Sequence, residues 1–111
     1  MQFIVIGRDG DDADASERRA RVRPKHLDFI RPFVERGQVL LGGAILDDAG
    51  TMVGSTILAD FETRDELDDW LRNDPYVTEG VWRHFEVHPF RTAVGAWMPN
   101  EAMGERPIGA S

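Results

Sequence analysis

The sequence contains no cysteine, which excludes disulfide bonds, thiolate metal sites and thiol nucleophiles. It also has no apolar run long enough to cross a membrane. Residues 1–7 lack the basic region that opens a signal peptide, and their apolar run is short. We therefore expect a cytoplasmic protein that has no membrane partner.

Three functional signatures are missing as well. Gly7 and Gly10 do not extend into a Gly-x-Gly-x-x-Gly fingerprint, and there is no phosphate-binding loop. No serine lies in a Gly-x-Ser-x-Gly elbow. A nucleotide is therefore not indicated, and we expect no cofactor.

Basic residues are fewer than acidic ones, 13 against 20, which gives a net charge of -7. A chain of this charge repels phosphate backbones, so nucleic acid is not an expected partner. One basic cluster stands out, formed by Arg18, Arg19, Arg21, Arg23 and Lys25. Because five acidic residues at positions 9–17 offset it, we interpret the cluster as a solvated, self-compensating segment.

The 111 residues, 41% hydrophobic and 30% charged, suit a single globular domain. Apolar patterning predicts strands at residues 3–6, 38–46, 52–61 and 81–90, the middle two forming a hairpin. It predicts helices at 16–36, capped by Ser16, and at 63–73, opened by a capping box.

In the first helix, Pro24 is expected to restart the helix and Pro32 to kink it. Gly42 and Gly43 are expected to mark a bulge or a close backbone approach.

The element order β-α-β-β-α-β is the ferredoxin-like α+β plan, an antiparallel sheet with both helices on one face. The other face needs a cover, and a second copy of the chain is the simplest one, so we expect a homodimer. Residues 1–92 form the predicted domain. Residues 93–111 form an extension, in which 93–97 could add an edge strand or contact a partner through Trp97 before a mobile tail.

His26 is the most informative single residue. It shares one side of the predicted helix with Ile30 and Phe33, which places an ionisable ring at the edge of the apolar stripe made with Leu27, Phe29 and Val34. Such an imidazole can act as a general base if a carboxylate orients its other nitrogen. The alternative is a structural histidine, hydrogen-bonded to the backbone between sheet and helix.

Asp74 and Ser55 each have a structural and a functional interpretation. Asp74 precedes Pro75, the usual arrangement for capping a new helical turn, and a cap has a second oxygen free to orient a histidine. Ser55 follows Gly54 in a strand, where a packing role, a substrate hydrogen bond or nucleophilic attack are all conceivable; we favour the hydrogen bond. Tyr76 lies beside Asp74 and is expected to line the same pocket.

His84, Glu86 and His88 alternate along the last strand, so all three lie on one side of the sheet. Three such groups can in principle bind zinc. An exposed or dimer-facing polar strand face gives the same alternation, and we favour that interpretation over a metal site.

Several segments together resemble the YCII-related (YciI-like) family. They are His26 with Leu27, the strand segment 42–44, the Gly54–Ser55 step, residues 74–77 followed by Gly80, and the closing strand 87–91. The similarity covers roughly residues 1–92. It implies a ferredoxin-like fold and a dimeric α/β barrel.

The resemblance also implies site residues. A histidine–aspartate pair in a pocket between sheet and helices maps to His26 and Asp74, and a small polar pocket residue maps to Ser55. The family usually has Arg or Lys where this sequence has His88, so a substrate contact at His88 would differ here. Family members are linked to lyase-type chemistry on small ring substrates, including dehydrochlorination.

Two functional hypotheses follow. The first is an enzyme that binds a small cyclic molecule and uses lyase- or hydrolase-type acid–base chemistry, with His26 as base and Asp74 as its partner. The second is a non-catalytic dimeric domain that binds a small ligand in the same pocket. Direct contact between His26 and Asp74 beside an open pocket favours the first.

Overall fold

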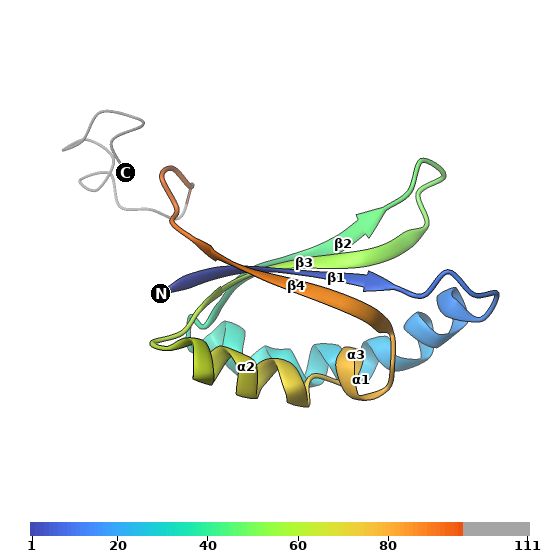
Figure 1. Ribbon diagram of the computed structural model, residues 1–111, viewed down its shortest axis with the longest axis horizontal. Coiled ribbons are helices and arrows are strands. Elements are labelled where there is room, and N and C mark those ends of the chain that lie inside the picture. The colour runs from blue at the N-terminus through green and yellow to red at the C-terminus, as the bar shows by residue number, and fades with distance from the viewer. Residues whose placement is uncertain (97–111) are drawn as a thin grey trace.

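The computed structural model describes residues 1–96. Within them, four strands and three helices follow in the order β1, α1, β2, β3, α2, α3, β4 (Figure 1). Their bounds are β1 Gln2–Asp9, α1 Ala15–Glu35, β2 Val39–Leu46, β3 Met52–Asp60, α2 Arg64–Asn73, α3 Pro75–Thr78 and β4 Trp82–Phe90.

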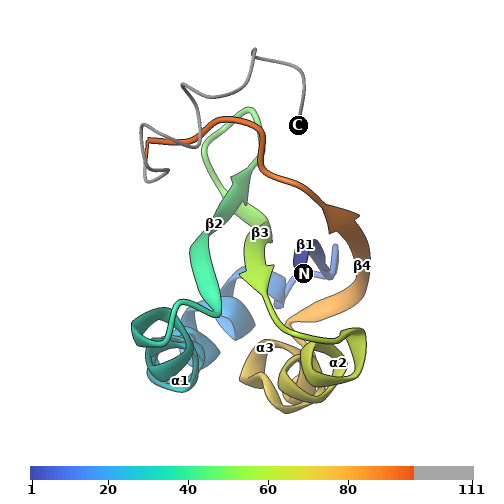
Figure 2. The ribbon, with the colours of Figure 1, turned by 90° about the vertical axis from the view of Figure 1, so that its left-hand side faces the viewer.

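The strands form one antiparallel sheet in the order β2-β3-β1-β4. All three helices lie against the same face of this sheet, α1 at one side of the layer and α2 with α3 at the other (Figure 2). The predicted ferredoxin-like architecture is therefore confirmed. None of the helices in residues 1–96 is long and apolar enough to span a bilayer.

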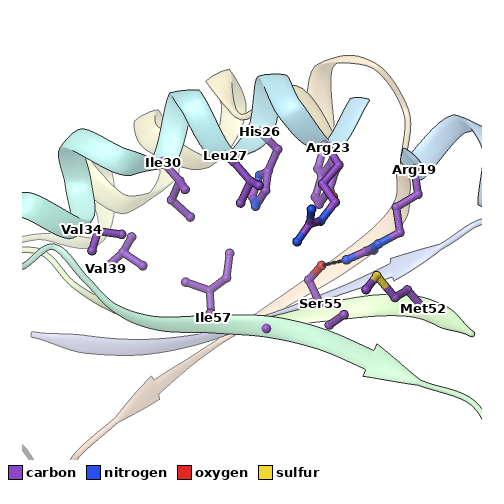
Figure 3. A pocket seen from close by; sticks show the side chains of 14 residues that line it. Arg19, Arg23, His26, Leu27, Ile30, Val34, Val39, Met52, Ser55 and Ile57 are labelled. Carbon is purple, nitrogen blue, oxygen red and sulfur yellow. Dashed lines mark hydrogen bonds between the residues drawn. The ribbon is translucent and has the colours of Figure 1, made fainter. Parts of the chain in front are cut away.

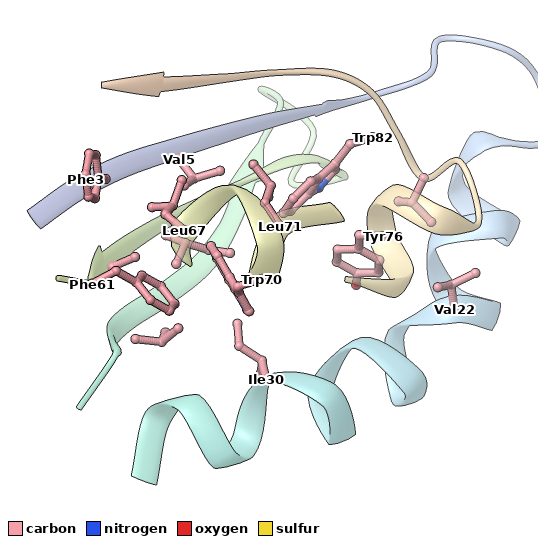
Figure 4. Close-up of a cluster of buried hydrophobic side chains, with 14 residues drawn as sticks. Phe3, Val5, Val22, Ile30, Phe61, Leu67, Trp70, Leu71, Tyr76 and Trp82 are labelled. Atoms are coloured by element: carbon pink, nitrogen blue, oxygen red, sulfur yellow. The ribbon is translucent and has the colours of Figure 1, made fainter. Parts of the chain in front are cut away.

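The hydrophobic core fills the space between the sheet and the helices (Figure 4). Phe3 and Val5 project from β1 onto this side because alternate residues of a strand share a face. Leu67 and Trp70 reach them from α2, and Ile30 from α1. The capping box predicted for α2 is present in part, since the hydroxyl of Thr63 accepts a hydrogen bond from the Glu66 amide at 3.2 Å.

Helix α1 differs from its predicted form at two points. It begins at Ala15, after Asp14, so Ser16 lies inside the first turn and is not its cap. It also runs without a break through Pro24 and Pro32, so no restart occurs at Pro24. Burial of Val22 and Ile30 against the core explains the continuity, because tertiary packing of one helix face outweighs the backbone hydrogen bonds that two prolines remove.

The glycines of the hairpin do not form the expected bulge. The register shifts next to Leu40 and again next to Leu46, whereas Gly42 and Gly43 pair regularly with Ile57 and Thr56. A close backbone approach occurs instead at Gly54, where a methyl group would overlap the carbonyl oxygen of Gly7. A methyl group at Gly7 would overlap the indole ring of Trp82, so the missing side chain lets Trp82 lie against β1.

The chain after β4 forms no strand in residues 91–96. It is held to the sheet where the Thr92 amide donates to the side-chain oxygen of Gln2 at 2.9 Å. Trp97, and with it the remainder of the predicted extension, lies outside the described residues.

Candidate active site

A cavity of about 290 Å³ lies between α1 and the strands β2 and β3 (Figure 3). We call it the α1–β3 cavity. Its polar wall is formed by Arg19, Arg23, His26, Ser55 and Tyr76. The rest of its lining is apolar or glycine, namely Leu27, Ile30, Val34, Val39, Gly42, Gly43, Ala44, Met52 and Ile57. Gly42 and Gly43 therefore leave room for a ligand.

His26 and Asp74 are in direct contact. The Nδ1 of His26 lies 2.8 Å from the Oδ1 of Asp74, and the two residues are 8% and 0% exposed. The same oxygen accepts a hydrogen bond from the Tyr76 amide at 2.8 Å, so Asp74 caps α3 and contacts His26 at once. A carboxylate only accepts hydrogen bonds, so it places the proton of a neutral imidazole on Nδ1 and leaves Nε2 basic.

The plane of the His26 ring is set by its aromatic neighbours. The ring stacks on Tyr76, with centroids 3.9 Å apart and planes 4° from parallel, and Trp82 meets it edge-on at 6.2 Å. Burial raises the pKa of Tyr76 above its ordinary value, so its phenol keeps its proton at neutral pH and is no base. Tyr76 and Trp82 thus orient the imidazole of His26.

Ser55 is the end of a buried polar chain that starts at Asp9. The guanidinium of Arg19 donates from Nη1 to both oxygens of Asp9, at 2.9 and 3.0 Å, and from Nη2 to the hydroxyl of Ser55 at 2.8 Å. The indole nitrogen of Trp82 donates to the same hydroxyl at 3.3 Å. Arg19 also lies over the Tyr76 ring, 4.9 Å from its centroid. This chain fixes the Ser55 oxygen on the cavity wall.

The ion pair of Asp9 and Arg19 is almost fully shielded from water. Their side chains are 3% and 7% exposed. Burial raises the pKa of Asp9 above its ordinary value, although the hydrogen bond from Arg19 acts in the opposite direction. Desolvation therefore outweighs the attraction for this carboxyl group.

The structure brings together four of the residues selected from the sequence. His26, Ser55 and Tyr76 line the cavity, and Asp74 lies directly behind His26. His88 is elsewhere. Val5 faces the core and pairs with Val87, so the neighbouring His88 projects from the helix-free face of the sheet.

The alternating side chains of β4 do not converge as a metal site. His88 lies 2.9 Å from a carboxylate oxygen of Glu86, and this contact lowers the pKa of Glu86. Across residues 1–96, no three His, Asp or Glu side chains lie close enough together to hold a metal ion. The described part of the chain therefore presents His84, Glu86 and His88 as an exposed polar strand face.

Two arginines of the site were missed by the sequence interpretation. The basic cluster is not uniformly solvated, because Arg19 is buried and both Arg19 and Arg23 line the cavity. The outer members do pair at the surface, Arg18 with Asp12, Arg21 with Glu17 and Lys25 with Glu79. The signal was present in the helical spacing, since positions 19, 23, 26 and 30 follow one side of a helix.

The predicted apolar stripe of α1 is divided. Ile30 is buried in the core, whereas Leu27 and Val34 are 38% and 51% exposed and line the cavity instead. A helix that packs on the sheet along one line leaves the flanking apolar residues free to border a hollow. Leu27 and Val34 thus provide apolar surface for a ligand.

Comparison with known proteins finds a family and close relatives. The YCII-related domain matches residues 1–91. Protein YciI from Escherichia coli O6:H1 is 37% identical over 97 residues, which cover 82% of this chain and 97% of that protein. A protein from Emericella nidulans, named derivative of benzaldehyde biosynthesis cluster protein C, is 33% identical over 76 residues, covering 62% of this chain and 78% of that one.

A solved structure has the same architecture. It is the 5-chloro-2-hydroxyhydroquinone dehydrochlorinase (TftG) from Burkholderia phenoliruptrix AC1100, in complex with 2,5-dihydroxybenzoquinone. The TM-score is 0.71 over 82% of this chain and 94% of that chain, at 23% sequence identity. At this identity the likeness shows a shared fold.

Proposed function

The chain belongs to the YCII-related domain family, as its motifs predicted, and we propose that it is an enzyme that catalyses lyase-type acid–base chemistry on a small cyclic substrate. The observation that supports this most is the 2.8 Å contact between His26 and Asp74 at the wall of the α1–β3 cavity. The fold shared with a dehydrochlorinase supports the choice of reaction class.

In the proposed elimination, Nε2 of His26 takes a proton from the substrate and a leaving group departs with its bonding electrons. The substrate gains a double bond and loses one molecule of acid overall. Asp74 stabilises the imidazolium that forms, and the stacked Tyr76 ring keeps the imidazole in one plane. Ser55 holds a substrate oxygen from β3.

A second candidate, a non-catalytic ligand-binding domain, is favoured by one observation. His26 is only 8% exposed, and a base must be reached by the proton that it removes. In that case the same cavity serves recognition, and His26 contributes a hydrogen bond.

The test is chloride release from 5-chloro-2-hydroxyhydroquinone and related chlorinated hydroquinones. Replacing His26 with asparagine keeps an amide that can donate to Asp74 but removes the basic nitrogen. We expect turnover to fall ~10²–10⁴-fold, the usual contribution of a general base. His84→Asn is the matched control, since it makes the same change on exposed β4 and is expected to retain full turnover.

Undiminished turnover in His26→Asn would rule out this residue as the base. Binding of the ring compounds without turnover of any of them by the unaltered chain would favour the second candidate.

We also propose that the chain is a homodimer that pairs helix-free sheet faces. The face carries Ile4 and Ile6 from β1, with the exposed Leu41 and Phe90 beside them. His88 belongs to this face, so in the proposed dimer it lies near the partner rather than near His26. Sedimentation equilibrium at micromolar concentration is expected to give twice the chain mass of 12.5 kDa. A mass near that of one chain would contradict the dimer.

A further inference from the structure

We propose that the α1–β3 cavity selects a small ring bearing an anionic oxygen, a phenolate, enolate or carboxylate, which Ser55 and Arg23 bind together. This inference rests on the proposed function for the site that it describes. It does not require His26 to act as a base.

The hydrogen bonds of Ser55 leave it only one role toward a ligand. A hydroxyl group has one hydrogen to donate and two lone pairs. Arg19 Nη2 and Trp82 Nε1 both donate to the Ser55 oxygen, so both lone pairs are occupied. In residues 1–96 no acceptor takes the Ser55 hydrogen, and the side chain lines the cavity. Ser55 therefore offers a ligand a donor, which requires an acceptor atom on that ligand.

The partners of Ser55 also strengthen this donor. Arg19 is cationic, and hydrogen bonds from charged groups polarise the hydroxyl that accepts them. The polarised hydroxyl favours an oxygen that carries negative charge. The same occupied lone pairs argue against Ser55 as a nucleophile, because attack on a substrate needs one of them.

Arg23 supplies the second contact. It lies one helical turn before His26, and its guanidinium projects from α1 toward β3 (Figure 3). Whereas Arg18, Arg19, Arg21 and Lys25 each pair with a carboxylate, Arg23 forms no ion pair within residues 1–96. An unpaired guanidinium with several donors suits a carboxylate or phenolate oxygen.

The charge balance of the cavity points the same way. No aspartate or glutamate is among the described residues that line the cavity, although the whole chain has a net charge of -7. Of the nearby carboxylates, Asp9 is paired with Arg19, and Oδ1 of Asp74 contacts His26 and accepts from the Tyr76 amide, while Oδ2 of Asp74 is buried and has no partner in the described residues. Ile30, Val39 and Ile57 supply apolar surface for the ring itself. Within the described residues Arg23 is thus the cation of the lining without a paired carboxylate, and such a cation attracts small anions.

The experiment is calorimetric titration of the full chain at pH 7 with 2,5-dihydroxybenzoquinone, which is anionic at this pH. The neutral probe is 2,5-dimethoxybenzoquinone. We expect the unaltered chain to bind the anion at least ~10-fold more tightly, the gain of a hydrogen bond to a charged group. Arg23→Gln is expected to weaken anion binding ~3–10-fold, a modest effect because Arg23 is exposed, and 0.5 M salt should shrink it.

Two comparisons make the result specific. Arg23→Gln should leave the affinity for the neutral probe unchanged, which separates charge from the added bulk of the methyl groups. Arg21→Gln, on the same helix but outside the cavity, should bind both probes as the unaltered chain does. Ser55→Ala should also weaken binding of the anionic probe. This substitution leaves two buried donors, on Arg19 and Trp82, without their acceptor, so it can also destabilise the fold. Arg23→Gln, at an exposed position, is therefore the decisive variant.

The proposal is overturned if Arg23→Gln binds the anion as tightly as the unaltered chain, if the neutral probe binds equally well, or if neither probe binds at millimolar concentration. Its failure is distinct from that of the catalytic proposal. Loss of turnover in His26→Asn with unchanged binding in Arg23→Gln would overturn only the anion site. Full turnover in His26→Asn together with weakened anion binding in Arg23→Gln would overturn only the proposal that His26 is the general base.

Discussion

Asp74→Asn is expected to lower the turnover number ~10²–10⁴-fold, the range that a positioned acid–base group contributes. The asparagine oxygen can take the place of Oδ1 and still accept from Tyr76 N–H and His26 Nδ1–H. The ring then keeps its orientation and its proton on Nδ1. What is lost is the negative charge that stabilises the imidazolium formed when His26 takes a proton.

The Asp74→Asn substitution should affect the turnover number and the Michaelis constant differently. The imidazolium exists only after proton transfer, so the substitution should lower kcat while KM changes little. Steady-state kinetics on a chlorinated hydroquinone provides the measurement, with circular dichroism to verify the fold. Asp48→Asn, in the exposed turn between β2 and β3, is the matched control. A kcat within about threefold of the unaltered chain would leave Asp74 as a helix cap alone.

The second large effect concerns stability. Asp9→Leu is expected to lower the free energy of unfolding by ~3–5 kcal/mol, because it leaves the buried guanidinium of Arg19 without its counter-charge. The two side chains are 3% and 7% exposed, so water cannot replace the lost partner. Urea denaturation followed by tryptophan fluorescence measures the change.

The double variant Asp9→Leu/Arg19→Met tests the cause. Removing both charges should recover most of the loss, since apolar side chains of similar volume often replace a buried ion pair at little cost. The raised pKa of Asp9 supports this expectation, because it means that folding disfavours the ionised carboxyl. In the unaltered chain, the contribution of Asp9 to stability therefore decreases as the pH rises from below 3.8 through the folded-state pKa. A double variant no more stable than Asp9→Leu would show that the ion pair is not the source of the loss.

The contact between His26 and Asp74 was predictable to an unusual extent, and for a local reason. His26 lies at the edge of an apolar helix stripe, and Asp74 precedes Pro75 at a helix start, so both positions follow from short-range rules. Family motifs then linked the two. Arg19 and Arg23 escaped notice because acidic neighbours in the sequence suggested a self-neutralising surface. Only Asp9, on β1, actually meets Arg19, and Arg23 meets no carboxylate in the described residues.

The position of His88, by contrast, could not be predicted from local sequence rules. Strand alternation correctly placed His84, Glu86 and His88 on one side of β4, but a period of two does not say which side faces the helices. That choice follows from the pairing of Val87 with Val5, a contact between strands some eighty residues apart in sequence.

The amino-acid sequence by itself determined the element order and the helix starts at Thr63 and Asp74, because periodicity, caps and turns act over a few neighbouring residues. The tertiary structure alone decided which charges are buried, which arginines enter the cavity and which face of β4 its histidines occupy. These depend on the packing of α1 against β2 and β3 and on strand register, which join residues distant in the chain.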